Sequence, residues 1–286
     1  LRRNAGDIPG GSMSDQLTGY NAFVTGGGSG IGLSCAKAFA MDGANVLIMG
    51  RNAEKLADAA EEIRRVAPSV TVATYAGDVS KEQDVEAAVA AAAIDGKLDI
   101  AVANAGTGGL APVMVTQAES WNQILQTNLT GTFYTFKHAG AAMARSGGGA
   151  MCAISSIAGV RTHRFMASYC VSKAGIDMLV RNSADELGVA NIRVNSVCPG
   201  LVDTEIATGL MTTEVVHDDY LECMPISRTG VVEDISNAVR FLCGPESSWI
   251  TGVNLSVDGG HHLRRGPNVE PFSRMLFGDE ITEGKV

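Results

Sequence analysis

Short apolar runs alternate with longer amphipathic stretches along most of this chain, and this alternation restricts its fold more than any other feature. Seven of the runs are apolar nearly throughout, and stretches with apolar residues three or four positions apart separate them. Strands that are apolar on both faces belong to parallel sheets covered by helices on both sides. The alternation therefore predicts an α/β fold, a doubly wound parallel sheet of seven strands with helices on both faces.

The boundaries of these elements follow from the same pattern. We expect strands at Ala22–Thr25, Asn45–Met49, Thr71–Tyr75, Leu98–Ala103, Ala150–Ser155, Ile192–Cys198 and Asn254–Val257. We expect helices at Gly30–Asp42, Ala53–Val66, Lys81–Ala93, Gln117–Ser146, Ala167–Leu187 and Val231–Leu242. Asn52 is a good N-cap for the second helix, because its side chain can accept a bond from a free backbone N–H.

The chain is expected to form one catalytic domain at 13–260. Its 286 residues allow one large or two small domains, and no linker interrupts the alternation. Residues 1–12 precede Met13 and are interpreted as a tag or a disordered extension. The segment at about 203–224 follows the sixth strand and is interpreted as a helical or mobile lid. Residues 261–286 form a tail with two prolines and little periodicity.

Composition excludes several classes of partner. The net charge is −9 with no basic run, which argues against nucleic acid. No apolar run approaches ~18 residues, so no membrane span is expected. The six cysteines are scattered and form no C-x-x-C pair, which indicates free thiols in a reducing, cytoplasmic compartment. His261 and His262 lack a third ligand, so we expect no metal.

A glycine-rich turn follows the first expected strand and opens the first expected helix. It reads Thr25-Gly26-Gly27-Gly28-Ser29-Gly30-Ile31-Gly32. Glycines there permit a tight turn and let backbone N–H groups approach a pyrophosphate, while the helix N-terminus favours the anion. Placed between strand and helix, the run predicts nucleotide binding on a Rossmann sheet.

The T-G-x-x-x-G-x-G spacing resembles that of the short-chain dehydrogenases/reductases, and the resemblance extends over about residues 19–260. Single matches are modest, but their order and separations are specific. The matching positions are Gly26, Ser29, Gly30, Ile31 and Gly32 in the turn, then Asp78 and Val79, Asn104, Ala105 and Gly106, Asn128, Ser156, Tyr169 and Lys173, Pro199, Gly200 and Thr204, and Asp258-Gly259-Gly260. The resemblance implies a nicotinamide cofactor held by these positions.

The end of the second expected strand bears on which nicotinamide is used. In dinucleotide-binding folds an acidic residue there binds the ribose 2′-hydroxyl, whereas an arginine suits a 2′-phosphate. The strand here ends in Met49-Gly50-Arg51-Asn52, with no acid. Arg51 therefore favours NADP(H) over NAD(H), and Ser29 can add a hydroxyl contact. The simpler alternative is that Arg51 is a surface residue at a helix start.

Tyr169 and Lys173 lie four residues apart, so they share one face of a helix. A free phenol has a pKa of about 10, and a lysine at ~4 Å in a dielectric of ~20 favours the phenolate by up to ~4 kcal/mol, or about three pKa units. The resemblance implies that Tyr169 exchanges the proton, Lys173 lowers its pKa and holds the ribose, and Ser156 bonds the reacting oxygen. It also implies that Asn128 holds a water chain to Lys173, and it selects Ser156 over its neighbour Ser155.

The resemblance implies an NAD(P)H-dependent oxidoreductase that moves hydride between nicotinamide and a carbonyl or secondary alcohol, and it implies a homotetramer with the tail as a subunit contact. The substrate is open between a 3-oxoacyl thioester and a general ketone or alcohol. Arg161 and Arg164 can meet an anionic substrate or lie in a solvated loop, and Met211 and Met224 can line a pocket or pack the lid. The alternative function is a catalytically silent NADP(H)-binding sensor or scaffold.

Overall fold

The computed structural model describes residues 15–285, so the extension expected at 1–12 lies outside the described part of the chain. The fold is one seven-stranded parallel sheet in the order β3-β2-β1-β4-β5-β6-β7. Its strands are β1 Asn21–Thr25, β2 Asn45–Gly50, β3 Val72–Ala76, β4 Ile100–Ala103, β5 Gly149–Ile154, β6 Ile192–Pro199 and β7 Asn254–Val257. The predicted doubly wound Rossmann sheet is confirmed.

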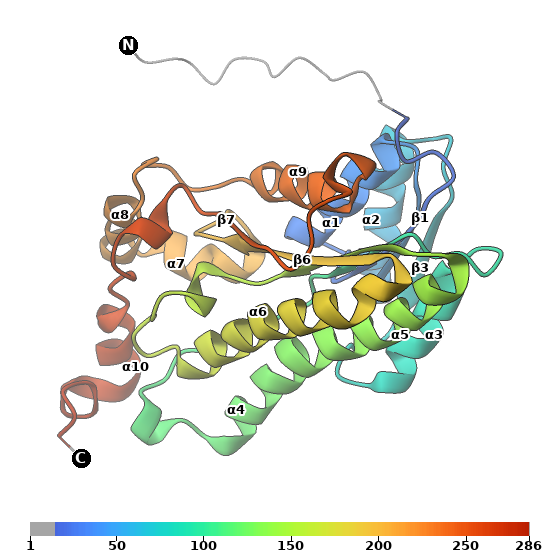
Figure 1. Ribbon diagram of the computed structural model, residues 1–286. Coiled ribbons are helices and arrows are strands. Elements are labelled where there is room, and N and C mark those ends of the chain that lie inside the picture. Colours follow the sequence, from blue (N-terminus) through green and yellow to red (C-terminus); the bar gives the residue numbers. More distant parts are fainter. Residues whose placement is uncertain (1–14, 286) are drawn as a thin grey trace, which may run out of the picture.

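Helices cover both faces of the sheet, as Figure 1 shows. One face carries α1 Gly30–Met41, α2 Ala53–Val66 and α9 Val232–Cys243, and the other carries α3 Glu82–Ala92, α5 Gly131–Ser146 and α6 Ala167–Leu187. Successive residues of one strand point to opposite faces. Val24 therefore packs under α1 and α2, while its neighbour Phe23 packs under α3 and α5. The burial of both residues explains why the strand sequence is apolar without alternation.

The long helix expected at 117–146 is divided by a change in helical hydrogen bonding. It comprises α4 Ala118–Leu125, a π-helical turn η2 at Gln126–Thr130, and α5. A π-turn changes the backbone ladder but not the apolar spacing, so the sequence pattern does not show it. Such single turns are frequent at functional sites, and this one contains Asn128.

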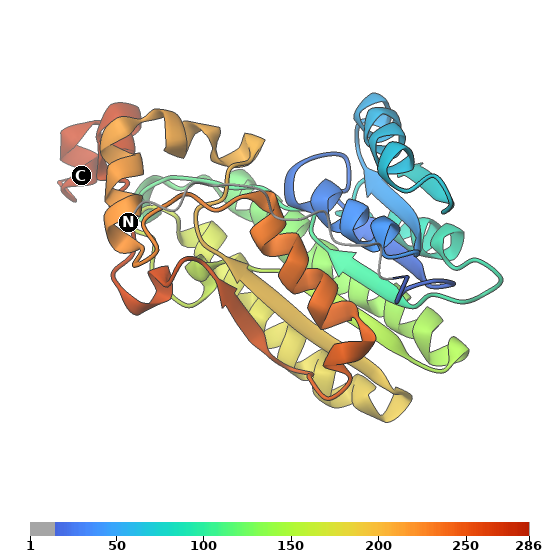
Figure 2. The same ribbon diagram turned by 90° about the horizontal axis from the view of Figure 1, so that it is seen from above.

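The lid and the tail lie together at one end of the molecule (Figures 1 and 2). The lid is helical, with a short turn η5 at Glu205–Ala207, then α7 Thr208–Thr212 and α8 Glu214–Cys223. The tail contains α10 Glu270–Thr282, although little periodicity is visible in its sequence. Gly278 interrupts that helix with φ of 81°, which explains the broken pattern. Val269 and Phe272 of the tail pack on the lid residues Val216 and Tyr220.

Candidate active site

The predicted site residues gather at the carboxyl ends of the strands. The glycine turn follows β1, Arg51 follows β2, Asp78 follows β3, Asn104 follows β4, Ser156 follows β5 and Pro199 ends β6. In an open parallel sheet this edge is where ligands bind, at the point where the strand order reverses. That reversal lies between β1 and β4 here. The glycine turn and the Asn104 turn flank it.

Glycine is required at two positions of the phosphate-binding turn. Gly26 has φ of +66°, and a Cβ on it would lie 2.7 Å from Asn104 Nδ2. A Cβ on Gly32 would lie 2.3 Å from the carbonyl oxygen of Gly26. Asn104 Nδ2 donates to the carbonyl oxygens of Thr25 at 2.9 Å and Gly26 at 3.2 Å. The asparagine therefore locks the two turns together, with backbone close enough that only glycine fits.

The start of α1 offers free backbone donors to an anion. Ser29 is the N-cap, and its side chain makes no capping hydrogen bond. The N–H groups of the first helical turn have no partner within a helix, and the helix dipole favours negative charge there. The turn has no room for a Cβ at Gly26 or Gly32, and backbone N–H groups are free at the start of α1. Both features fit the diphosphate of a dinucleotide.

The carboxyl ends of β2 and β3 carry side chains of opposite charge. The Asp78 carboxylate accepts from the backbone N–H of Ser80 at 2.9 Å and from its hydroxyl at 2.8 Å. Burial opposes ionisation of Asp78, but these hydrogen bonds and the charge of Arg51 hold its pKa below the usual range. Arg51 itself is exposed. An ionised acceptor and an exposed guanidinium thus lie at the neighbouring ends of β3 and β2.

Ser156, Tyr169 and Lys173 are brought together by β5 and α6. Lys173 is buried, and its Nζ lies 5.6 Å from the centroid of the Tyr169 ring and donates to the Ile154 carbonyl at 2.8 Å. Burial lowers the pKa of Lys173 to about 8, although the charge of Asp177 opposes the shift. Burial likewise raises the pKa of Tyr169, and a hydrogen bond with Ser156 acts against it.

The expected lowering of the Tyr169 pKa by Lys173 is therefore not found in the protein alone. The lysine ammonium engages the Ile154 carbonyl, and burial of the phenol dominates. Only the hydrogen bond with Ser156 lowers the phenol pKa here. The spacing of four residues correctly placed Tyr169 and Lys173 on one face of α6, but spacing carries no information on desolvation.

Asn128 is fully buried in the π-turn, and its amide is already engaged. Its Oδ1 accepts from the Thr107 N–H at 2.8 Å, and its Nδ2 donates to the Thr107 carbonyl at 2.9 Å and to Ser172 Oγ at 3.0 Å. The side chain joins the loop after Asn104 to the catalytic helix. Asn128 thus clamps the Thr107 loop to α6, and the water chain that the resemblance implies stays a prediction.

Two buried groups beside the site have structural contacts. Ser155 Oγ donates to the Lys173 carbonyl at 3.2 Å, so the hydroxyl next to Ser156 holds α6 in place. Asp177 accepts from Ser196 Oγ at 3.3 Å, which ties α6 to β6. Sequence reasoning missed Asp177. Its position four residues after Lys173, on the same helix face, was the available signal.

The two arginines before the catalytic tyrosine are engaged by the tail. Arg161 Nε donates to the His262 carbonyl at 2.8 Å, and Arg164 pairs with Glu270. The lid is held in the same way, because Arg265 binds both Asp219 carboxylate oxygens, at 2.8 and 2.6 Å. These contacts favour the structural interpretation of Arg161 and Arg164 over binding of an anionic substrate.

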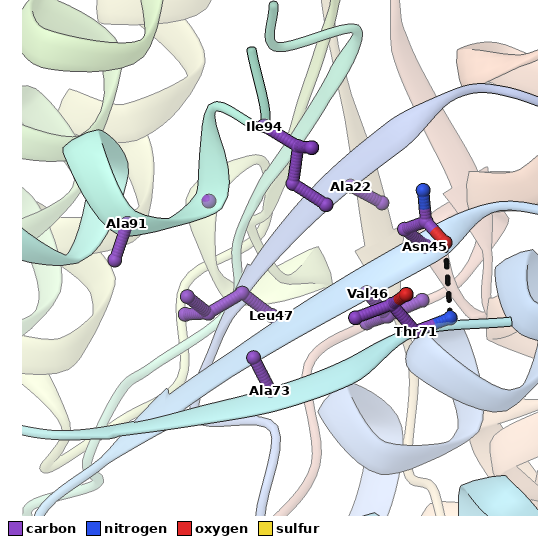
Figure 3. A pocket seen from close by; sticks show the side chains of 9 residues that line it. Ala22, Asn45, Val46, Leu47, Thr71, Ala73, Ala91 and Ile94 are labelled. Atoms are coloured by element: carbon purple, nitrogen blue, oxygen red, sulfur yellow. Dashed lines mark hydrogen bonds between the residues drawn. The ribbon is translucent and has the colours of Figure 1, made fainter. Parts of the chain in front are cut away.

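A small cavity of about 20 Å³ lies at the other edge of the sheet, away from these residues (Figure 3). It is lined by the amino-terminal parts of β1 and β2, including Ala22 and Asn45, where Asn45 Oδ1 accepts from the Thr71 N–H at 2.9 Å. Among residues 15–285 no cluster of three metal-ligating side chains occurs. Within the same range, no helix has the length and apolar character needed to span a bilayer.

Known proteins are similar to this chain in sequence and in fold. The sequence model of the family described as enoyl-(acyl carrier protein) reductase matches residues 26–262. A 7alpha-hydroxysteroid dehydrogenase of Escherichia coli is 36% identical over 247 residues, covering 86% of this chain and 95% of that protein. A 3-oxoacyl-(acyl-carrier-protein) reductase of Chlamydia muridarum is 37% identical over 250 residues, covering 87% and 99%.

Solved structures agree with the sequence comparison. A short-chain type dehydrogenase/reductase from Mycobacterium ulcerans has a TM-score of 0.91 at 38% identity, covering 94% of this chain and 99% of that one. A 7 alpha-hydroxysteroid dehydrogenase complexed with NADH and 7-oxo glycochenodeoxycholic acid has a TM-score of 0.82 at 35% identity, covering 87% and 97%.

The chain belongs to the short-chain dehydrogenase/reductase family. It is an oxidoreductase that uses a nicotinamide cofactor and acts between a carbonyl and an alcohol, as the resemblance in its motifs implied. This conclusion sets aside the interpretation as a silent sensor or scaffold.

Proposed function

We propose that this enzyme reduces a ketone with NADPH, and oxidises the corresponding secondary alcohol with NADP⁺, through Ser156, Tyr169 and Lys173. The observation that carries the proposal is the convergence of these side chains beside the glycine turn, at the edge of the sheet where the strand order reverses. The bound nicotinamide supplies or accepts the hydride. The protein supplies position and a proton.

Each catalytic side chain has a role that its geometry supports. Ser156 and the Tyr169 hydroxyl, which share a hydrogen bond, hold the carbonyl oxygen. Tyr169 gives this oxygen its proton in reduction and removes it in oxidation. Lys173, with its pKa near 8, contacts the cofactor ribose and, once the cofactor is bound, stabilises the deprotonated phenol, an effect not found in the protein alone. Asn128 is a positioning residue that fixes Thr107 and α6.

The cofactor site extends along the same edge. We assign Gly26, Ser29, Gly30, Ile31 and Gly32 to the phosphates, Asp78 and Val79 to the adenine, and Asn104, Ala105 and Gly106 to the ribose side. Pro199, Gly200 and Thr204 hold the carboxamide. Arg51 meets the 2′-phosphate. The absence of an acid at the end of β2 supports NADP(H), whereas the hydroxysteroid dehydrogenase relative was solved with NADH.

An apolar ketone or secondary alcohol is the substrate class that the surroundings support. The lid core near the site is built from Leu110, Phe165, Leu210 and Met211 around Tyr220. Met224 is buried within this core, and Arg161 and Arg164 are held by the tail. A 3-oxoacyl thioester is the second candidate, supported by the reductase relative from Chlamydia muridarum.

We also infer one catalytic domain at 13–260 containing the lid, a cytoplasmic location, and a homotetramer with the tail at 261–286 in a subunit contact. Exposed apolar residues on the outer helices support association. Phe133 on α5 and Val171 and Met178 on α6 are 45, 47 and 51% exposed. An outer helical face of this kind is typical of subunit interfaces.

The test combines binding with turnover. Purified protein is titrated with NADPH and NADH by fluorescence, and absorbance at 340 nm is then followed with a panel of apolar ketones and 3-oxoacyl thioesters. We expect tighter binding of NADPH and turnover of a ketone. Tyr169→Phe should reduce kcat by about 100-fold or more while cofactor binding persists. Binding of neither nucleotide, or full activity of Tyr169→Phe, would overturn the proposal.

A further inference from the structure

An exposed ion pair joins α2 to the lid beside the glycine turn. Lys55 Nζ lies 3.1 and 2.8 Å from the two carboxylate oxygens of Glu205, the first residue of the lid turn η5. The side chains are 52 and 69% exposed. Pairs as exposed as this contribute about 1 kcal/mol or less. Lys55 can therefore exchange Glu205 for another anion at little cost.

The pair lies against the turn that receives the cofactor phosphates. A Cβ on Gly28 would lie 3.7 Å from Lys55 Cβ, and a Cβ on Gly30 would lie 3.4 Å from Cγ2 of Thr204, which directly precedes Glu205. Both partners of the pair line a cavity of about 580 Å³ together with this turn. An ammonium in this position is close to where the phosphates of a dinucleotide bind.

The position of Lys55 in the sequence favours a contact with the 2′-phosphate over a contact with the diphosphate. Asn52 caps α2 directly after Arg51, and Lys55 follows in the first helical turn. Lys55 therefore belongs to the segment directly after β2, the part of the fold that meets the 2′-substituent of the adenosine ribose. The diphosphate faces the start of α1 instead. Arg51 and Lys55 thus belong to the same segment after β2, with Lys55 Nζ paired to Glu205 and the charge of Arg51 acting on Asp78.

The other charged residues that line the cavity determine how strongly a phosphate is attracted to it. Lys37, the second cation in the lining, is held by Glu62 at 2.5 Å. Asp58, Asp203 and Glu233 add negative charge. An entering phosphate is therefore repelled by the surrounding carboxylates and attracted by Lys55, and it competes with Glu205 for the same ammonium.

We propose that Lys55 is a second determinant of the NADP(H) preference, binding the 2′-phosphate beside Arg51, and that Glu205 competes with this phosphate for the lysine. The proposal rests on NADP(H) being the cofactor. It assigns the two partners opposite effects on affinity, because one attracts the phosphate and the other occupies its site.

The experiment measures the Kd of NADPH and of NADH for the full-length protein by fluorescence titration. We expect Lys55→Gln to raise the Kd of NADPH about tenfold, as for loss of one charge-assisted hydrogen bond, and to change the Kd of NADH less than twofold. Glu205→Gln should lower the Kd of NADPH about threefold.

Lys37→Gln and Glu62→Gln are the matched controls, because that pair lines the same cavity about two helical turns further along α1. Both controls should leave the two Kd values unchanged.

The outcomes separate this inference from the cofactor assignment. A wild-type protein that prefers NADH overturns both. A wild-type preference for NADPH that Lys55→Gln leaves intact overturns only the role of Lys55. An equal loss of affinity for both nucleotides shows a diphosphate contact and likewise overturns the 2′-phosphate assignment. A Glu205→Gln variant that weakens NADPH binding contradicts the competition.

Discussion

Ser155 and Ser156 are neighbours in sequence but have different partners. Ser156 shares a hydrogen bond with Tyr169, whereas Ser155 bonds the Lys173 backbone carbonyl. We predict that Ser156→Ala reduces kcat by about 100-fold, as for removal of a donor to a developing oxyanion, and also loses the hydrogen bond that Ser156 Oγ accepts from the Ala158 N–H. Ser155→Ala should cost about 1 kcal/mol of unfolding free energy and reduce kcat far less. Steady-state kinetics and urea unfolding check the pair, and a reversed pattern would contradict the assignment.

His163 gives the protein a pH-dependent stability that can be measured. It is buried near the rings of His261 and Tyr220, and burial lowers its pKa to about 4, although a hydrogen bond with the Arg161 carbonyl opposes the shift. Because the folded pKa lies below the unfolded value of about 6.5, the unfolded chain takes up the proton first as the pH falls. Stability from His163 is therefore complete above about pH 6.5 and is lost as the pH falls towards 4.

The test of this linkage compares wild type with His163→Gln. Between pH 7 and pH 5 the wild type should lose about 2 kcal/mol of unfolding free energy more than the variant. Urea unfolding at the two pH values measures the difference. Equal losses in the two proteins would show that His163 is not held neutral by burial.

At the scale of elements, the tail joins the loop before the catalytic helix to the lid. Arg161 and Arg164 contact tail residues, and Arg265 binds Asp219 on α8. The apolar positions Met275 and Leu276 of α10 remain 71 and 59% exposed, which supports the proposed contact with another subunit.

We therefore predict that removal of residues 266–286 lowers the mass of the protein in solution, measured by light scattering after size-exclusion chromatography. The same deletion should raise KM, because Val269 and Phe272 no longer pack on the lid. Arg274→Ala serves as a milder control, since this residue pairs mainly within the tail. An unchanged mass after truncation would count against the subunit contact.

At the scale of the whole molecule, the alternation of apolar strands and amphipathic helices was sufficient to predict the parallel sheet and the presence of helices on both of its faces. All seven strands formed, with ends shifted by at most two residues, as at β4, which begins at Ile100 rather than Leu98. The edge strands β3 and β7 are less buried than the expected apolar pattern implies, because an edge strand lacks a neighbour on one side.

The site was predictable where it depends on backbone and spacing, and not where it depends on tertiary burial. Gly26 and Gly32 indicate that two backbone segments lie close together at the turn. The four-residue spacing of Tyr169 and Lys173 indicates that they share one face of a helix. The bond from Lys173 to Ile154, the clamp of Asn128 on Thr107 and the burial that raises the Tyr169 pKa arise from segments distant in sequence. No local pattern encodes them.

The central claim is that hydride passes between the nicotinamide and a carbonyl carbon in this site. The most direct measurement uses NADPH deuterated at C4, prepared separately as the two C4 epimers, with the preferred ketone of the panel and mass spectrometry of the alcohol. The account predicts that one epimer transfers a single deuterium to the alcohol carbon and that Tyr169→Phe slows this transfer by about 100-fold or more. An alcohol without deuterium from either epimer, or no alcohol from any ketone, would contradict it.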